Sequence, residues 1–254
     1  MFAFLARRPV VSVGMERGSN HCKSCRLQLQ GDRLRLEEWR SDGPLPGPAR
    51  VGLNSHLSVV QTIGRGEDPE RFFSFSGEQG LVRVQPLSDE LSQLGASPLT
   101  LPRDGVYDLE VLAVVTACRQ AHPDKDSYGI LHLGVNGRCL IVADGPGIRS
   151  HWCGYWPENA DPDELGLAIQ QRMDYCRLRR WPLPEKFLAT GEHTEWCAHL
   201  PIAAEPADPL AGIAFSGHPP SPRLAAALGL ALRQLNPPGL RYAVCRADEP
   251  GGWN

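Results

Sequence analysis

The residues best suited to chemistry lie in one stretch near the start of the chain, Val11 to Leu27, which reads VSVGMERGSNHCKSCRL. We expect an apolar strand, a turn over Gly14 to Ser19, and a second strand. Glycines in such a turn leave backbone N–H groups free to face an anion. The spacing is Gly-x-acid-x-Gly-Ser-x-x-x-Lys, and it covers Gly14, Glu16, Gly18, Ser19 and Lys23. The stretch indicates an anion-binding hairpin, although any glycine-rich β-hairpin would look similar.

A second strand–turn–strand unit lies near the middle of the chain, where Tyr128 to Val142 reads YGILHLGVNGRCLIV. Its turn spans Gly134 to Gly137, and His132 ends the first strand. Asn-Gly is a strong hairpin signal by itself, so a purely structural role also explains this unit. Two such units, each opening a β-rich half that is followed by helices, predict a duplicated fold of two lobes around a cleft.

The remaining elements complete these halves. We expect a half-buried strand over 28–39, a loop over 41–48 and a strand over 50–63. The phenylalanines at 72, 73 and 75 favour an edge strand, and Leu81 to Val84 another. Apolar spacing predicts helices over Tyr107 to His122 and Asp161 to Arg180, the second with Asp161 as its cap and Pro162 in its first turn.

A strand over Pro184 to Thr190 runs into Gly191 and Glu192. A last helix then begins near Ser221, and it combines a leucine stripe with small residues that keep it thin. Gly229 costs a helix about 1 kcal/mol relative to alanine, so we expect another backbone to pass close to it. Residues 242–245 favour a final strand.

Composition sets limits on function. The net charge of -3 in 254 residues gives no electrostatic reason to expect a nucleic-acid surface, which normally has a basic excess. No run of eighteen apolar residues is present, so we expect no membrane span. The eight cysteines are scattered, which favours reduced thiols in a cytosolic protein. Cys22 and Cys25 have no second pair for a zinc site and fall in a predicted strand, so metal or redox use is disfavoured.

The order of elements resembles the actin-like ATPase superfamily, and within it the branch of the pilus assembly protein PilM and the cytoplasmic part of the secretion protein GspL. The resemblance rests on the hairpins VSVGMERGSNHCK and ILHLGVNGRCLIV, the helical segment RMDYC, the strand FLATGE and the helix AAALGLALR. It implies an α/β, mixed-sheet, actin-like (ribonuclease H-like) fold. Its first lobe would cover 1–123 with a shortened insertion over 41–101, its second lobe 124–220, and a returning helix and strand 221–254.

The resemblance also implies a nucleotide cleft, and this sequence departs from the pattern there. Glu16 keeps an acid in the first hairpin, whereas His132 stands where the second acid belongs, and imidazole is a poor ligand for Mg²⁺. Gly191 is followed by Glu192 instead of a second glycine. We therefore expect no hydrolysis, no required cofactor, and at most weak binding of ATP and Mg²⁺. The residues of this degenerate cleft would be Gly14, Glu16, Gly18, Ser19, Lys23, His132, Gly134 and Gly191.

The sequence leaves three functional hypotheses. The resemblance implies a non-catalytic cytoplasmic scaffold of a type IV pilus or type II secretion platform, held at the inner membrane by the tail of a PilN-like protein. The alternative is an actin-like ATPase or small-molecule kinase, with Asp144 or Glu192 supplying the missing acid. A hydrolase built on His151 and Cys153 is disfavoured because no Gly-x-Ser-x-Gly elbow is present. Trp152, Tyr155 and Trp156 could contact a partner or pack beneath the following loop.

Overall fold

A computed structural model describes most of the chain. It covers residues 9–17, 21–53, 58–75, 80–98, 106–134, 137–144, 147–155, 161–181, 183–217 and 222–235. The predicted strand over 242–245 and the aromatic residue Trp156 lie outside these ranges. Among the described residues, no helix combines the length and apolar character needed to cross a membrane.

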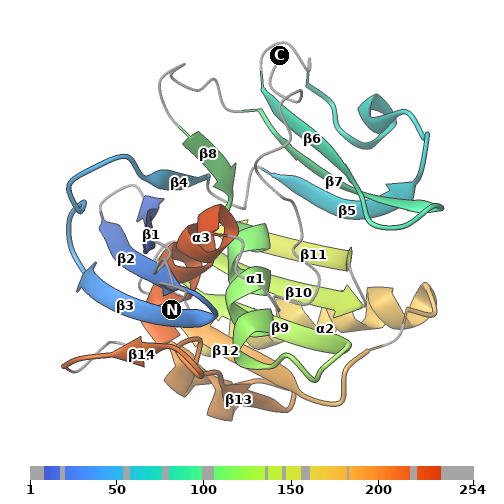
Figure 1. Ribbon diagram of the computed structural model, residues 1–254. Coiled ribbons are helices and arrows are strands. Elements are labelled where there is room, and N and C mark those ends of the chain that lie inside the picture. Colours follow the sequence, from blue (N-terminus) through green and yellow to red (C-terminus); the bar gives the residue numbers. More distant parts are fainter. Residues whose placement is uncertain are drawn as a thin grey trace.

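The first lobe is built on a six-stranded sheet (Figure 1). In spatial order its strands are β14 (Ala214–Phe215), β3 (Arg33–Arg40), β2 (Cys22–Gln30), β1 (Val10–Arg17), β4 (Arg50–Leu53) and β8 (Val106–Leu109). β1 to β3 form an antiparallel meander, while β4 lies parallel to both β1 and β8. Because β14 pairs with β3, the chain returns to the first sheet before residue 221, the predicted start of the returning segment.

The second lobe repeats this arrangement. Its sheet has the order β11 (Gly147–Tyr155), β10 (Gly137–Asp144), β9 (Ser127–Leu133), β12 (Phe187–Gly191) and β13 (Ala204–Pro206). Again the first three strands are antiparallel and the last two run parallel to the first. Leaving β14 aside, both sheets place their strands in the order third, second, first, fourth, fifth. The duplication predicted from the two hairpins is therefore present in the topology.

A third sheet follows β4 in the chain and consists of β5 (Val59–Gly64), β7 (Leu91–Ser97) and β6 (Leu81–Pro86). It belongs in sequence to the first lobe but contacts β11 of the second (Figure 1). The Thr62 hydroxyl donates to the carbonyl of Ile148 at 2.9 Å, and the N–H of Ile148 donates to Gln93 Oε1 at 2.8 Å. The predicted strand over 50–63 is thus two strands in different sheets.

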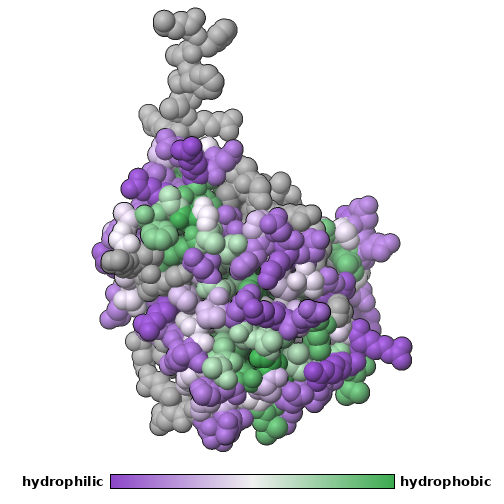
Figure 2. Space-filling model, turned by 90° about the horizontal axis from the view of Figure 1, so that it is seen from below, coloured by the Kyte–Doolittle hydropathy of each residue, from purple (hydrophilic) through white to green (hydrophobic). Residues whose placement is uncertain are grey.

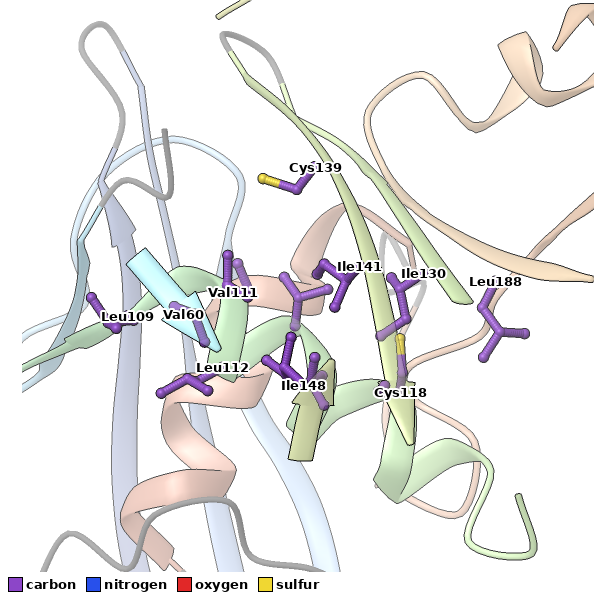
Figure 3. Packing of buried hydrophobic residues seen from close by; sticks show 14 of the residues in the cluster. Val60, Leu109, Val111, Leu112, Cys118, Ile130, Cys139, Ile141, Ile148 and Leu188 are labelled. Carbon is purple, nitrogen blue, oxygen red and sulfur yellow. The ribbon is translucent and has the colours of Figure 1, made fainter. Parts of the chain in front are cut away.

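Two helices lie between the lobes and a third covers the far face of the second sheet (Figure 1). They are α1 (Glu110–Ala121), α3 (Ala225–Leu235) and α2 (Pro162–Leu178), accompanied by the short 3₁₀ helices η2 (Pro69–Phe72), η4 (Thr194–His199) and η5 (Pro222–Leu224). Figure 3 shows Val60 of β5, Leu112 of α1 and Ile141 of β10 in one cluster. Along β9, Ile130 packs in this cluster and Leu131 in the cluster beneath α2, so both faces of the strand are buried.

Two predicted elements are wrong in detail. The helix expected to begin at Tyr107 begins at Glu110, because residues 106–109 form β8 at the edge of the first sheet. The expected edge strand over 72–75 is absent, since Phe72 lies in η2. The rings of Phe73 and Phe75 instead stack at 4.5 Å between centroids and pack against the core of the third sheet. Apolar content alone did not distinguish these conformations.

The exposed large hydrophobic side chains of the described residues are spread over several elements. They are Val10, Val11, Val84, Val106, Leu167, Tyr175, Leu178 and Phe215. Figure 2 likewise shows hydrophilic and hydrophobic residues interspersed over the face seen from below. Trp152, considered above as a partner contact, packs partly buried against the core beneath α2.

The expectation that all cysteines are reduced is wrong for one pair. Cys139 of β10 and Cys153 of β11 form a disulfide, with their Cα atoms 4.2 Å apart. The antiparallel register places them directly opposite each other. The separation of 14 residues does not by itself predict the disulfide, because the two cysteines are opposite each other only if the β10–β11 turn lies midway between them.

The free thiols are expected to differ in reactivity. Burial raises the pKa of Cys25 and of Cys118 to about 12, so neither forms thiolate at pH 8 in the folded protein. Cys22 and Cys197 are partly exposed. Brief iodoacetamide treatment at pH 8 should therefore modify Cys22 and Cys197 before Cys25 and Cys118, as measured by peptide mass spectrometry. In urea Cys25 and Cys118 should react as well; their rapid labelling in the native state would contradict this burial.

Candidate functional site

The candidate site begins with an acid and a cation on the first hairpin. Glu16 of β1 and Lys23 of β2 are directly opposite in the antiparallel register, and both are buried. Lys23 Nζ lies 3.7 Å from Glu16 Oε1, and His21 Nε2 lies 3.8 Å from the same oxygen. Because successive side chains of a strand alternate in direction, Glu16 points to the opposite face from its neighbours in the chain.

Lys23 makes its shortest ion pair across the lobes. Its Nζ lies 2.5 Å from Glu192 Oε1, and Glu192 directly follows β12 of the second sheet. The second carboxylate oxygen of Glu192 accepts from Arg223 Nε at 3.0 Å. Glu192 therefore pairs with two cations, Lys23 and Arg223. Its pair with Lys23 connects the first hairpin to the second lobe.

The second hairpin brings His132 to the same place. The side chain of His132 is 2% exposed, and its Nδ1 lies 2.9 Å from the hydroxyl of Thr190 on β12. Its Nε2 lies 3.3 Å from Oε1 of Glu110, the first residue of α1. Glu16, Glu110 and His132 place ligand-type atoms within 4.8 Å of one another.

The surroundings keep Glu16 ionised. Burial is the largest influence and by itself raises the pKa of a carboxyl. The nearby imidazole of His21, the ammonium of Lys23 and the nearby ring of His132 together outweigh burial, so the pKa of Glu16 is lowered. A buried carboxylate is thus maintained by neighbours drawn from both hairpins.

The first of the predicted glycines serves packing. Gly14 is not in the turn, because β1 continues to Arg17 and Gly14 pairs with Cys25. A Cβ there would lie 1.9 Å from the carbonyl oxygen of Ala227 in α3, so the glycine serves helix packing and not anion binding. Gly18 and Ser19 lie outside the described residues.

Two further predicted glycines lie beside His132. Gly191 has φ of 103°, and a Cβ there would lie 2.2 Å from the Leu133 carbonyl oxygen. The same oxygen accepts the N–H of Glu192 at 2.7 Å. Gly134 offers its carbonyl to the guanidinium of Arg138. The structure therefore brings together five of the predicted residues, namely Glu16, Lys23, His132, Gly134 and Gly191. Gly14 instead packs against α3.

Three residues of the cluster were missed from sequence. The helix predicted from the sequence begins at Tyr107, three residues too early, so that prediction does not place Glu110 at the helix N-terminus. Thr190 and Arg223 gave no local signal, because they join the cluster through pairing between distant parts of the chain. Asp144, considered as a substitute acid, is at the opposite end of β10 and pairs with Arg149 at 3.1 Å.

His151 and Cys153 of β11 do not form the catalytic dyad that a hydrolase would need. His151 directs its two ring nitrogens at the carbonyl oxygens of Val60 and Ser58, at 2.7 and 3.1 Å. Cys153 is held in the disulfide with Cys139. Both side chains are thus engaged in joining strands, and no thiolate is available for attack.

The structure is similar to structures of known proteins. It is similar to a PilM–PilN type IV pilus biogenesis complex, with a TM-score of 0.69, 16% identity, and coverage of 88% of this chain and 98% of that one. A Bacteroides thetaiotaomicron VPI-5482 protein of actin-like ATPase fold matches with a TM-score of 0.49, 7% identity, and coverage of 86% and 95%. The cytoplasmic domain of EpsL, an inner-membrane component of the Vibrio cholerae type II secretion system, matches with a TM-score of 0.46 and 11% identity. The match covers 88% of this chain and 95% of that one. No protein-family model and no curated protein matches the sequence.

The similarity to the PilM–PilN complex agrees with the repeated sheet order. The protein has the actin-like fold, and the resemblance to PilM stated from the sequence is confirmed at the level of the fold.

Proposed function

We propose that this protein is a non-catalytic scaffold of a type IV pilus or type II secretion assembly platform, where it binds the cytoplasmic tail of a PilN-like membrane protein. It would lie at the cytoplasmic face of the inner membrane and be held there through that partner. The observation that carries the proposal is the fold similarity to the PilM–PilN complex over nearly the whole of both chains.

The charges of the candidate site support the non-catalytic part. Nucleoside triphosphates bind where cations and N–H groups face the phosphates and oxygens face Mg²⁺. Here Lys23 and Arg223 are already paired with Glu192, so a phosphate would have to displace a carboxylate of the protein itself. Glu16 and Glu110 add negative charge nearby. Imidazole at 132 replaces an oxygen ligand. The residues present therefore do not fit Mg-ATP.

The alternative is an actin-like ATPase or small-molecule kinase. One observation favours it, namely that Glu16, Glu110 and Lys23 converge on one place. A carboxylate that orients a nucleophile and an ammonium that meets phosphate are parts of phosphoryl-transfer sites. Turnover of Mg-ATP that Lys23→Ala abolishes would favour this alternative over the scaffold.

Partner binding is tested with the full chain and soluble peptides. Fluorescently labelled cytoplasmic tails of PilN-like proteins from genomes that carry this gene are titrated and followed by anisotropy, with scrambled peptides of equal composition as controls. We expect saturable binding of a tail and none of its scrambled version. Failure of every such tail to bind would overturn the proposed partner.

Nucleotide binding gives a second prediction. Removing the charge with Glu192→Gln frees Lys23 and Arg223, and we expect the affinity for Mg-ATP to rise about tenfold, which equals about 1.4 kcal/mol. Isothermal titration calorimetry measures the change. Glu195→Gln is the matched control, because this carboxylate is exposed and pairs only with His193 among the contacts described for it. Unchanged affinity in Glu192→Gln would contradict the assigned competition; tight binding by the wild type would contradict the degenerate site.

A further inference from the structure

Glu16, Glu110 and His132 converge from three different elements. They belong to β1 of the first sheet, the start of α1, and β9 of the second sheet. Each offers one possible ligand atom, and all three atoms lie within 4.8 Å of one another. Metal ions commonly bind where carboxylates and imidazoles from separate elements meet in this way.

Two buried atoms in this group have no hydrogen-bond partner. Glu16 is 5% exposed, and its Oε2 accepts no hydrogen bond. His132 is 2% exposed, and its Nε2 makes no hydrogen bond although it faces Glu110 Oε1 at 3.3 Å. Buried polar atoms are nearly always satisfied, so both atoms indicate that something is bound there.

The second ring nitrogen of His132 indicates what that is. When Nδ1–H donates to the Thr190 hydroxyl, Nε2 carries a lone pair that faces a carboxylate. In that tautomer two electron-rich groups face each other in a buried place, and a cation bound between them would offset the cost of burying them. A histidine whose other nitrogen is held by a hydrogen bond is the usual arrangement in metal sites.

We propose that Glu16, Glu110 and His132 bind a divalent transition-metal ion, zinc more tightly than manganese, independently of any nucleotide. Carboxylate oxygens with one imidazole nitrogen suit these ions, whereas Mg²⁺ prefers oxygen ligands alone. Three protein ligands leave a coordination position for water. The inference does not depend on the proposed function.

The neighbouring charges are compatible with a cation. Lys23 lies 3.7 Å from Glu16, but its ammonium is closer to Glu192, at 2.5 Å. Among the ion pairs described here, Glu192 pairs with Lys23 and Arg223, while Glu16 and Glu110 each also face an imidazole, that of His21 or His132. A divalent ion would therefore lie beside two carboxylates, and it would connect β1 to β9 across the two sheets.

The test uses the full chain, made metal-free by dialysis against a chelator. Zn²⁺, Mn²⁺ and Mg²⁺ are added separately, binding is measured by competition with a chromophoric chelator, and unfolding temperature is followed in parallel. We expect one Zn²⁺ per chain, weaker Mn²⁺, no Mg²⁺, and a higher unfolding temperature with Zn²⁺, since a ligand of the folded state stabilises it. Co²⁺ bound in place of Zn²⁺ should show no thiolate charge-transfer band.

Variants assign the site. Glu110→Gln changes a half-buried residue and should fold normally, and His132→Asn removes the nitrogen ligand. Loss of groups that only support a ligand costs metal affinity about 10- to 100-fold, so we expect each variant to lose about 100-fold or more. His199→Asn, an exposed histidine, is the control and should bind as wild type does. No Zn²⁺ binding by the wild type would overturn the inference, as would unchanged binding in Glu110→Gln or a thiolate band with Co²⁺. None of these outcomes bears on tail binding.

Discussion

Asp108→Asn is expected to destabilise the protein by about 3–5 kcal/mol, because it leaves two buried guanidinium groups without their carboxylate. Asp108 is 2% exposed. Arg50 Nη1 donates to Asp108 Oδ2 at 2.9 Å, and Arg233 donates from Nε to Oδ2 at 2.7 Å and from Nη2 to Oδ1 at 3.0 Å. The N–H of Leu109 also donates to Asp108 Oδ1 at 2.9 Å. One carboxylate thereby holds β4, β8 and α3 together.

Urea unfolding followed by circular dichroism measures the effect, and the midpoint should fall with little change in slope. Asp144→Asn removes a carboxylate from the largely exposed pair with Arg149 and should cost less than about 1 kcal/mol. Equal effects of the two substitutions would contradict the assigned role of the buried cluster. If Asp108→Asn does not fold, Arg50→Met tests the same contact from its other side, since it removes one cation and leaves the Arg233 pair.

The predictable part of this fold consists of local patterns. The two hairpins were found because strand, turn and strand follow one another in the chain. The helix α2 was found because Asp161 caps it, accepting from the N–H of Asp163 at 2.9 Å, and because Pro162 opens it. Gly229 was correctly assigned to close backbone packing, since a glycine in an otherwise strong helix usually marks a place where a side chain would not fit.

The unpredicted part depends on contacts between distant residues. No side chain caps α1, whose preceding residue is Leu109, so nothing in the sequence marked where β8 ends and the helix begins. That error concealed both Asp108 and Glu110. Asp108 is 58 residues from Arg50 and 125 from Arg233, and no spacing rule reaches that far. The same holds for Lys23 and Glu192, whose pairing exists only once the two sheets are in place.

Gly229→Ala is the second substitution with a large expected effect. Within a helix, alanine is favoured over glycine by about 1 kcal/mol, so propensity alone predicts stabilisation. A Cβ at position 229, however, would lie 1.8 Å from the carbonyl oxygen of Ala113 in α1 and 2.4 Å from its carbonyl carbon. Backbone atoms cannot rotate away as a side chain can, so α1 and α3 must separate. We expect a net loss of at least about 3 kcal/mol, because separation opens space in the core shared by the two lobes.

Gly166→Ala in α2 is the matched control for Gly229→Ala. It is the same substitution within a helix, but its Cβ would meet only the ring of Pro201, with the nearest atom at 3.3 Å. There propensity and contact nearly balance, and the free energy of unfolding should change by less than about 1 kcal/mol. Urea unfolding of both variants separates the two effects. If the Gly229→Ala protein is as stable as the wild type, α1 and α3 do not pack this closely. The close contact of these two helices between the lobes would then be contradicted.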